Sequence, residues 1–319
     1  MRVALLGFGK SGQSLFTELI QNDCVKEISV FDPYQISKIE NGFNGTTKVI
    51  FYQETFSLTQ QFDLVVIATP DHCHYLDLVK CIAYGIPAFV EKPLVTTRSD
   101  LVKVRDALSR KLDFKMTCNF ILRTSSLFTA AREEYLQGNF GSRVFVEGKY
   151  LYGRWNKLVQ GWRGHENYSV ILGGLIHLVD LSCFITGNFD HEVLIKSGRI
   201  TSKEPLYVHD FGHISMSSPK SGFFSLATDY SANVEHRRDL SIYGDLARLE
   251  VRGEKFECSP ELQNRFAGLS AAPRNKGALL SEFISYLVGT RSLNFNFPNT
   301  EEIFKVLDIC FGSLPDNVL

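Results

Sequence analysis

The chain opens with Met1-Arg-Val-Ala-Leu-Leu-Gly7-Phe-Gly9-Lys-Ser-Gly12, a short apolar run that leads directly into the spacing G-x-G-x-x-G. The apolar run predicts a strand, and the stretch Ser14–Asn22 predicts a helix behind the glycines. A second apolar run, Ile28-Ser-Val-Phe31, ends on Asp32, twenty residues after Gly12. A strand, a glycine turn, a helix and an acid at this distance together indicate a dinucleotide-binding turn.

Each glycine has a mechanical role in such a turn. Gly7 permits the tight change of direction, Gly9 leaves room for a pyrophosphate beside the backbone, and Gly12 lets the helix pack closely. The N–H groups at the helix N-terminus attract the phosphates. Asp32 would accept hydrogen bonds from the ribose hydroxyls and repel a 2′-phosphate, so the sequence predicts NAD in preference to NADP. The predicted contacts in the turn are Gly7, Phe8, Gly9, Lys10, Ser11 and Gly12.

The composition predicts a globular chain with a large core and two domains. The 319 residues are 44% hydrophobic and 22% charged, with a net charge of −1 at pH 7 and a pI of about 6.7. This balance gives no reason to expect nucleic acid or a membrane surface as a partner, and no apolar run approaches the roughly 20 residues that span a bilayer. The seven cysteines are scattered without a C-x-x-C, and a strand lies where a signal peptide would be. We therefore expect a cytoplasmic protein with reduced thiols.

Residues 1–120 alternate strand and helix patterns, which predicts a Rossmann domain of the α/β class with a doubly wound parallel sheet. Strand runs such as Leu64-Val-Val-Ile-Ala68 are almost wholly apolar, as in parallel strands covered on both faces. The predicted strands are Val3–Phe8, Glu27–Phe31, Lys48–Phe51, Asp63–Ala68, Ala88–Val90 and Phe114–Asn119. The predicted helices are Ser14–Asn22, Tyr75–Tyr84 and Asp100–Arg110.

Residues 121–319 predict a second domain of the α+β class, with an open and mainly antiparallel sheet that serves substrate binding and oligomerisation. The predicted strands are Arg143–Tyr152, His191–Ile200, Gly212–Ser217, Phe223–Tyr230, Arg238–Tyr243 and Ala247–Val251. The predicted helices are Leu127–Gln137, Leu175–Ile185, Ala278–Val288 and Thr300–Phe311. No Gly/Ser/Pro linker separates the domains, so we expect a ligand cleft between them. The apolar face of the open sheet predicts a homodimer or homotetramer.

Two further segments follow predicted strands of the first domain. Ala68-Thr-Pro-Asp-His-Cys-His74 and Val90-Glu-Lys92-Pro-Leu94 both lie at the carboxyl ends of parallel strands. Together with the glycine turn they resemble the glucose–fructose oxidoreductase / inositol dehydrogenase (Gfo/Idh/MocA) family, in which E-K-P is the most diagnostic element. Gly173-Gly-Leu-Ile-His177-Leu-Val-Asp180 is similar to the family's D-x-x-x-H-x-x-D helix. The resemblance covers the whole chain in order and is strongest over residues 1–95.

The resemblance implies an NAD(P)-dependent oxidoreductase that acts on a sugar or a nucleotide-linked sugar. Lys92 would face the substrate hydroxyl and the nicotinamide, His177 would take the hydroxyl proton, and Asp180 would be structural. The residues that would line the nicotinamide end are Thr69, Pro70, His74 and Glu91, besides Lys92. Asn119 and Arg123 resemble an N-x-R element that touches the sugar.

The same assignment follows from what the reaction needs. Oxidation of a secondary alcohol requires a hydride acceptor, a base for the hydroxyl proton, and a group that stabilises the developing alkoxide. NAD supplies the first of these. His177 is suited to act as the base near neutral pH, and Lys92 can stabilise the oxyanion electrostatically.

A basic and aromatic segment follows the first strand of the second domain. Arg154, Trp162 and Arg163 could bind a sugar ring and the phosphates of a nucleotide sugar, although an exposed amphipathic rim would explain them about as well. His72-Cys73-His74 predicts no metal site, because adjacent residues point in different directions and no acidic or Cys/His cluster accompanies them.

One position departs from the family pattern. Gly173 stands four residues before His177, where the family usually carries an aspartate that supports the histidine. Two alternatives to a sugar dehydrogenase therefore stay open. One is a catalytically silent dinucleotide sensor that acts through a protein partner, and the other is a non-sugar reductase, of imine or bilin type, on the same fold. The intact E-K-P element weighs against the bilin alternative.

Overall fold

The computed structural model describes residues 1–34, 47–54, 62–164, 168–202, 206, 208–231, 233–290 and 296–312. The chain forms two compact units. The first unit comprises Met1–Ile121 and Asn275–Ile303, and the second comprises Leu122–Arg274 and Phe304–Leu319. The first break in this division lies beside residue 120, where the sequence predicts a domain boundary. The stretch Asn275–Ile303 returns to the first unit, whereas the predicted boundary assigns it to the second domain.

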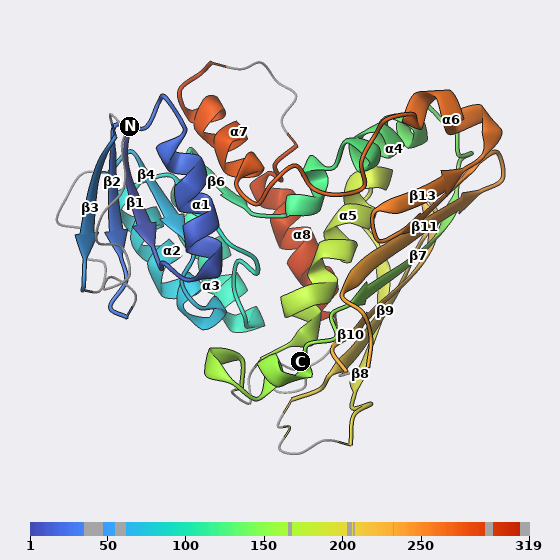
Figure 1. Cartoon of the computed structure of the whole chain (residues 1–319), viewed down its shortest axis with the longest axis horizontal. Coiled ribbons are helices and arrows are strands. Elements are labelled where there is room, and N and C mark those ends of the chain that lie inside the picture. Colours follow the sequence, from blue (N-terminus) through green and yellow to red (C-terminus); the bar gives the residue numbers. More distant parts are fainter. Residues whose placement is uncertain are drawn as a thin grey trace. The chain divides into compact units, whose positions relative to one another are not determined.

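The first unit contains a parallel sheet of six strands in the order β3-β2-β1-β4-β5-β6 (Figure 1). Its strands are β1 (Arg2–Leu6), β2 (Glu27–Phe31), β3 (Lys48–Tyr52), β4 (Leu64–Ile67), β5 (Ala88–Val90) and β6 (Met116–Cys118). Every neighbouring pair is parallel. This is the doubly wound Rossmann sheet that the sequence predicts, with the strand order reversing at β1 and β4.

Helices cover this sheet, and the strand order assigns them to its two faces. They are α1 (Lys10–Ile20), α2 (His74–Tyr84), α3 (Arg98–Ser109) and α7 (Ala278–Leu287). Phe16 of α1 and Phe283 of α7 are buried in one core with Leu5 and Val30 of the sheet. Right-handed crossovers in opposite directions place α2 on the other face.

The second unit contains a mixed sheet of seven strands in the order β13-β12-β11-β7-β10-β9-β8. Its strands are β7 (Val144–Leu151), β8 (Glu192–Gly198), β9 (Phe211–Ser218), β10 (Gly222–Asp229), β11 (Arg237–Gly244), β12 (Arg248–Arg252) and β13 (Lys255–Cys258). Only β7 and β10 pair in parallel, and the other neighbouring pairs are antiparallel. The prediction of an open, mainly antiparallel sheet is therefore confirmed.

Helices lie on one face of the second sheet (Figure 1). They include α4 (Ser126–Leu136) and α5 (Ile176–Thr186), and every residue of α5 is buried. In β7 the side chains alternate, so that Val144 and Val146 are buried while Phe145 is 43% exposed. The opposite face carries no helix among the described residues (Figure 1). Phe145 and Phe223, which are partners across β7 and β10, are both exposed.

The main differences from the predicted elements concern α1, β13 and α6 (Pro260–Phe266). Helix α1 begins at Lys10, four residues before the predicted start at Ser14, because its first turn contains no apolar residue and so shows no helical periodicity. Strand β13 and helix α6 are absent from the predicted set. Helix α8 (Thr300–Phe311) is as predicted.

No helix in the described part of the chain is long and apolar enough to cross a membrane.

Candidate functional site

The glycine turn has the geometry that a dinucleotide site requires. Gly7 has φ +85°, and a Cβ there would lie 2.6 Å from the carbonyl oxygen of Ala68. A Cβ at Gly12 would overlap the Gly7 carbonyl oxygen. A Cβ at Gly9, in contrast, would meet no described atom within 4 Å. Gly7 and Gly12 are therefore required by the fold itself, whereas Gly9 leaves the open space that a pyrophosphate needs.

The start of α1 offers hydrogen-bond donors to the same space. Gly9 is the N-cap residue, and no described side chain caps the helix there. The first backbone N–H groups of α1, at Lys10 and Ser11, therefore remain for an anion, with the positive end of the helix dipole behind them. These features fit the phosphates of a dinucleotide.

Asp32 lies directly after β2 and beside the glycine turn. Its Oδ2 accepts a hydrogen bond from the Phe8 backbone N–H at 2.6 Å, and its Oδ1 accepts one from the Tyr34 N–H at 2.7 Å. The side chain is 7% exposed. Each carboxylate oxygen has a further lone pair, so Asp32 can accept ribose hydroxyls while it holds the turn in place.

The loop that carries Lys92 is tied to the loop after β4 by His74. One ring nitrogen of His74 lies 2.7 Å from the Pro93 carbonyl oxygen, and the other lies 2.8 Å from that of Thr69. His74 is fully buried, whereas Lys92, Thr69 and Pro70 are partly exposed. His74 therefore joins the two loops from within, and its place at the nicotinamide end stays a prediction.

Glu91 and Asn119 form a second link beneath Lys92. The Asn119 amide donates to Glu91 Oε1 at 2.8 Å and to the Lys276 carbonyl oxygen at 3.1 Å. Burial raises the pKa of the Glu91 carboxyl, although the hydrogen bond from Asn119 and the charge of Lys92 act in the opposite direction. Asn119 is 1% exposed and has these partners inside the first unit, and its contact with the sugar stays a prediction.

In the second unit, α5 places His177 against strand β7. The imidazole stacks on the Tyr150 ring, with centroids 6.0 Å apart and an interplanar angle of 27°. His177 is 7% exposed. A ring held in this way has a defined orientation, which suits a side chain that accepts a proton.

Arg123 and Asp180 form a buried ion pair. Arg123 Nε lies 3.1 and 3.0 Å from the two carboxylate oxygens of Asp180, and Nη2 lies 2.7 Å from Oδ1. Arg123 is 2% exposed and Asp180 is fully buried, and the guanidinium lies 4.9 Å from the centroid of the Phe184 ring. Arg123 is thus a structural partner of Asp180, and its contact with the sugar stays a prediction.

Gly173 and Gly174 occupy a π-helical turn, Ile171–Leu175, directly before α5. A Cβ at Gly173 would overlap the Tyr168 hydroxyl, and one at Gly174 would lie 2.8 Å from the Tyr230 hydroxyl. The two hydroxyls lie 3.4 Å apart. Phenol groups therefore fill the space that a side chain at position 173 would need.

The predicted substrate contacts Arg154, Trp162 and Arg163 lie among cations and aromatic rings. The Arg154 guanidinium lies 5.3 Å from the centroid of the Tyr152 ring, and that of Arg163 lies 4.1 Å from the centroid of the Trp162 ring. Lys157 Nζ donates a hydrogen bond to the Tyr152 hydroxyl at 2.9 Å. All five of these side chains are partly exposed.

Sequence reasoning missed part of this arrangement. We use the term tyrosine cluster for Tyr150, Tyr152, Tyr168 and Tyr230 with His236. Ring centroids within it lie 4.5 Å apart for Tyr152 and Tyr230, and 5.2 Å apart for Tyr152 and His236. Tyr168, Tyr230 and His236 were not among the predicted site residues, and the position of Tyr230 at the end of a predicted strand was the available signal.

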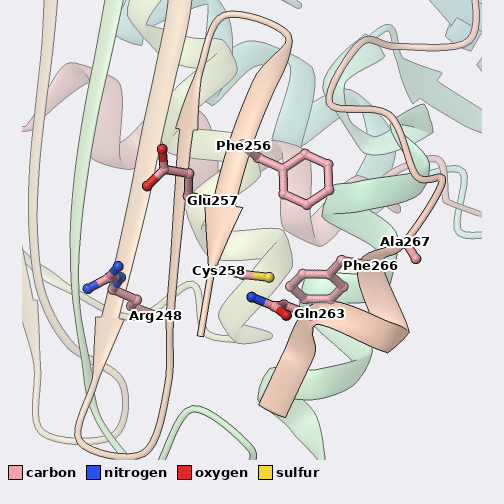
Figure 2. A pocket seen from close by; sticks show the side chains of 7 residues that line it. All are labelled: Arg248, Phe256, Glu257, Cys258, Gln263, Phe266 and Ala267. Carbon is pink, nitrogen blue, oxygen red and sulfur yellow. The ribbon is translucent and has the colours of Figure 1, made fainter. Parts of the chain in front are cut away.

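A pocket of about 460 Å³ lies elsewhere in the second unit, between β13 and α6 (Figure 2). Phe256 and Phe266 lie edge to face across it, with ring centroids 6.5 Å apart. Its lining residues are Arg248, Phe256, Glu257, Cys258, Gln263, Phe266 and Ala267, and they include no predicted site residue. Within the described ranges, no group of three or more His, Cys, Asp or Glu side chains could hold a metal ion.

Comparisons with known proteins agree with the glycine turn and the fold. Residues 1–116 match the family model described as oxidoreductase family, NAD-binding Rossmann fold. An inositol 2-dehydrogenase from Pseudarthrobacter chlorophenolicus is 24% identical over 219 residues, which are 67% of this chain and 62% of the relative. The match thus spans less than two thirds of that relative's length.

Solved structures match the fold of nearly the whole chain. The myo-inositol dehydrogenase from Lactobacillus casei, solved with NAD(H) and myo-inositol, has a TM-score of 0.73 at 17% identity over 97% of this chain and 92% of that one. The WlbA dehydrogenase from Chromobacterium violaceum, solved with NADH and UDP-GlcNAcA, has a TM-score of 0.74 at 18% identity over 97% and 91%. The fold and the glycine turn define a protein with a Rossmann unit of the dinucleotide-binding type. More specifically, residues 1–116 are similar to the Gfo/Idh/MocA family, whose model they match.

Proposed function

We propose that this protein is an NAD-dependent dehydrogenase or reductase that acts on a CH–OH group of a sugar bearing an anionic group, such as a nucleotide-linked sugar. The assignment of NAD as the cofactor is supported by the open space at Gly9 and by Asp32, which binds the same turn. Gly7, Gly9, Gly12 and the first turn of α1 would hold the pyrophosphate, and Asp32 would hold the ribose. When bound, NAD accepts or returns the hydride.

Two side chains would serve the reacting hydroxyl. Lys92 would donate a hydrogen bond to the substrate oxygen and stabilise its developing negative charge. His177 would take the hydroxyl proton, because a neutral imidazole is a base near neutral pH. His74 and Glu91 would act through Lys92, since they hold the loop from which it projects.

Cations around the tyrosine cluster support an anionic substrate. Arg154, Lys157 and Arg163 gather beside Tyr152 and Trp162. A guanidinium over an aromatic ring presents its N–H groups at the ring's edge, where a phosphate or carboxylate can accept them. A neutral polyol has no charge to match three cations. The named relatives include a protein solved with a nucleotide-linked sugar acid, UDP-GlcNAcA.

Nicotinamide absorbance tests this proposal directly. The purified protein is mixed with NAD and a panel of free and nucleotide-linked sugars, with NADP in parallel. We expect reduction of NAD by a sugar that carries a phosphate or carboxylate, and little reaction with NADP because Asp32 repels its 2′-phosphate. Turnover of neutral sugars alone would contradict the anionic assignment, and turnover with NADP alone would contradict the role of Asp32.

Substitution of Lys92 tests the catalytic assignment. Lys92→Ala removes the donor to the developing alkoxide, so kcat should fall by about two to three orders of magnitude while NAD binding is retained. Lys103→Ala is the matched control, because Lys103 pairs with Asp100 on the surface of α3, where no predicted site residue lies. Equal turnover of the two variants would remove Lys92 from the mechanism.

A second candidate function is a catalytically silent dinucleotide sensor. The observation in its favour is Gly173, where the Tyr168 hydroxyl takes the space of a side chain. This alternative predicts a rise in Tm with NAD but no nicotinamide reduction with any sugar of the panel. The panel and a thermal shift with NAD together separate the two functions.

A further inference from the structure

The hydrogen bond between Lys157 and Tyr152 has a defined direction. An ammonium group has three donors and no acceptor, so Lys157 Nζ donates and the phenol oxygen accepts, at 2.9 Å. The phenolic proton of Tyr152 must therefore find its acceptor elsewhere. No described residue accepts it, and the side chain is partly exposed. A ligand atom from outside the protein could therefore accept the hydrogen bond from the Tyr152 hydroxyl.

The surroundings of Tyr152 favour a negatively charged acceptor. The ring has Arg154 at 5.3 Å and Lys157 at 5.4 Å from its centroid. The charged groups that act on its hydroxyl within the described chain are Lys157, Arg163 and Arg154, all cations. An anionic oxygen that accepts from the phenol would thus sit next to three positive charges, and hydrogen bonds to charged groups are about twice as strong as neutral ones.

The same cations favour ionisation of this phenol. Burial alone would raise the pKa of Tyr152, but the hydrogen bond and charge of Lys157, with the charges of Arg163 and Arg154, lower it below its ordinary value. Two other members of the tyrosine cluster behave in the opposite way. Burial raises the pKa of Tyr150 to about 12, and burial also raises the pKa of Tyr230.

The neighbours of Tyr152 come from several elements. Tyr150 is on β7, Lys157 and Arg163 are on the two short helical turns Trp155–Leu158 and Gly161–Gly164, and Arg154 precedes the first of these turns. The other titratable groups around Tyr152 are Arg238 and the remaining members of the tyrosine cluster, Tyr168, Tyr230 and His236.

We propose that Tyr152, held by Lys157, is a specificity-determining residue that donates its phenolic hydrogen bond to the phosphate or carboxylate of the substrate. The proposal rests on the proposed function and deepens it, because it identifies the group that recognises the anion and makes recognition pH-dependent. Loss of the phenolic proton removes the donor and adds a negative charge beside the anion. Affinity for an anionic substrate therefore falls as the pH rises through the ionisation of Tyr152.

Near-ultraviolet difference spectra against pH test the ionisation without any turnover. The chain has 12 tyrosines, and we expect one phenol to ionise below the others in the wild type. Tyr152→Phe should remove that early transition, and Lys157→Met should move it to higher pH. Tyr135→Phe is the control, because Tyr135 lies on α4 and burial raises the pKa of its phenol. An early transition that persists in Tyr152→Phe would overturn the assignment, and so would one that Lys157→Met leaves unmoved.

Binding of inorganic pyrophosphate, followed by calorimetry on protein saturated with NAD, tests the recognition. Saturation fills the glycine turn, so pyrophosphate reports on the second unit. Tyr152→Phe keeps the ring and should weaken binding about tenfold at neutral pH. The wild type should then lose affinity as Tyr152 ionises, while the variant follows only the titration of pyrophosphate itself.

Equal affinity of the wild type and Tyr152→Phe, or parallel loss with pH, would overturn the proposal. The difference spectra and the pyrophosphate binding experiment require neither a substrate nor turnover. A protein that reduces no NAD with the sugar panel but shows both Tyr152 effects would thus contradict the proposed function alone.

Discussion

Arg123 and Asp180 form an ion pair in the interior of the second unit. Both side chains are almost completely buried, and the contact uses two nitrogens of the guanidinium. Removal of two charges from water costs several kcal/mol per ion, and the pair is stable only because each partner satisfies the other. Arg123 thus helps to hold α5, the helix on which His177 lies.

Loss of one partner leaves a buried charge without compensation. Asp180→Asn should lower the free energy of unfolding by about 3–5 kcal/mol, measured by urea denaturation. The double variant Arg123→Met/Asp180→Leu should recover much of that loss, because no charge then remains buried.

An exposed pair provides the control for this substitution. Lys305 and Asp190 lie 3.0 Å apart and both have solvent access, so Asp190→Asn should change the free energy of unfolding by less than about 1 kcal/mol. A similar small change for Asp180→Asn would show that the Arg123 charge is better solvated than its burial indicates.

At the scale of elements, the glycines in the turn between β1 and α1 have different roles. We expect Gly12 to be needed for folding and Gly9 to be needed for NAD binding. Gly12→Ala forces a Cβ into the Gly7 carbonyl, so we expect a lower Tm even without ligand. Gly9→Ala meets no described atom, so its Tm without ligand should stay near that of the wild type. The rise in Tm on addition of NAD should then be lost in Gly9→Ala, because the methyl group takes the space of the pyrophosphate.

Thermal shifts with and without NAD measure both effects. The contrast between the two alanine variants is the decisive observation, since each serves as the control for the other. A full NAD-induced shift in Gly9→Ala would mean that the pyrophosphate lies elsewhere.

Elements with strong periodicity could be predicted from the sequence, and short ones could not. The strands Glu27–Phe31 and Ala88–Val90 were predicted to the residue, because apolar runs between turn residues mark buried parallel strands. Strand β13, with the sequence Lys-Phe-Glu-Cys, is only half-buried, and α6 has seven residues. Neither is long enough to produce a periodic signal.

The geometry of the glycine turn could be predicted because its residues adjoin in sequence. Gly7, Gly9 and Gly12 share one turn, and their spacing alone indicates their roles. Asn119 pairs with Glu91, and Arg123 pairs with Asp180. Those partners lie 28 and 57 residues away along the chain, so one sequence does not indicate that these side chains satisfy each other inside the protein.

At the scale of the whole molecule, the uncovered face of the second sheet predicts self-association. Phe223 is 58% exposed and lies opposite Phe145 on β7, whose ring stacks with Tyr243 of β11 at 6.2 Å. Contiguous apolar rows on a sheet face mark interaction surfaces. We expect a homodimer or homotetramer in which this face is buried.

Phe223→Lys should shift the mass measured by light scattering toward that of the monomer, because it places a charge in the buried face. Leu112→Lys is the matched control, since Leu112 is 89% exposed in the first unit and should leave the mass unchanged. A wild-type mass equal to one chain of 36.0 kDa would contradict the prediction.

The return of Asn275–Ile303 to the first unit has a consequence for modularity. Leu279, Leu280, Phe283 and Ile284 of α7 belong to the same core as α1 and β1. A fragment that stops at residue 120 would expose the side chains of α1 and β1 that α7 covers. We therefore do not expect residues 1–120 to fold stably on their own. A chimera that exchanges the whole first unit between two similar proteins needs three junctions, near residues 121, 274 and 303. Exchange of the chain at a single junction near residue 121 would therefore bring the two parts of this core from different parents.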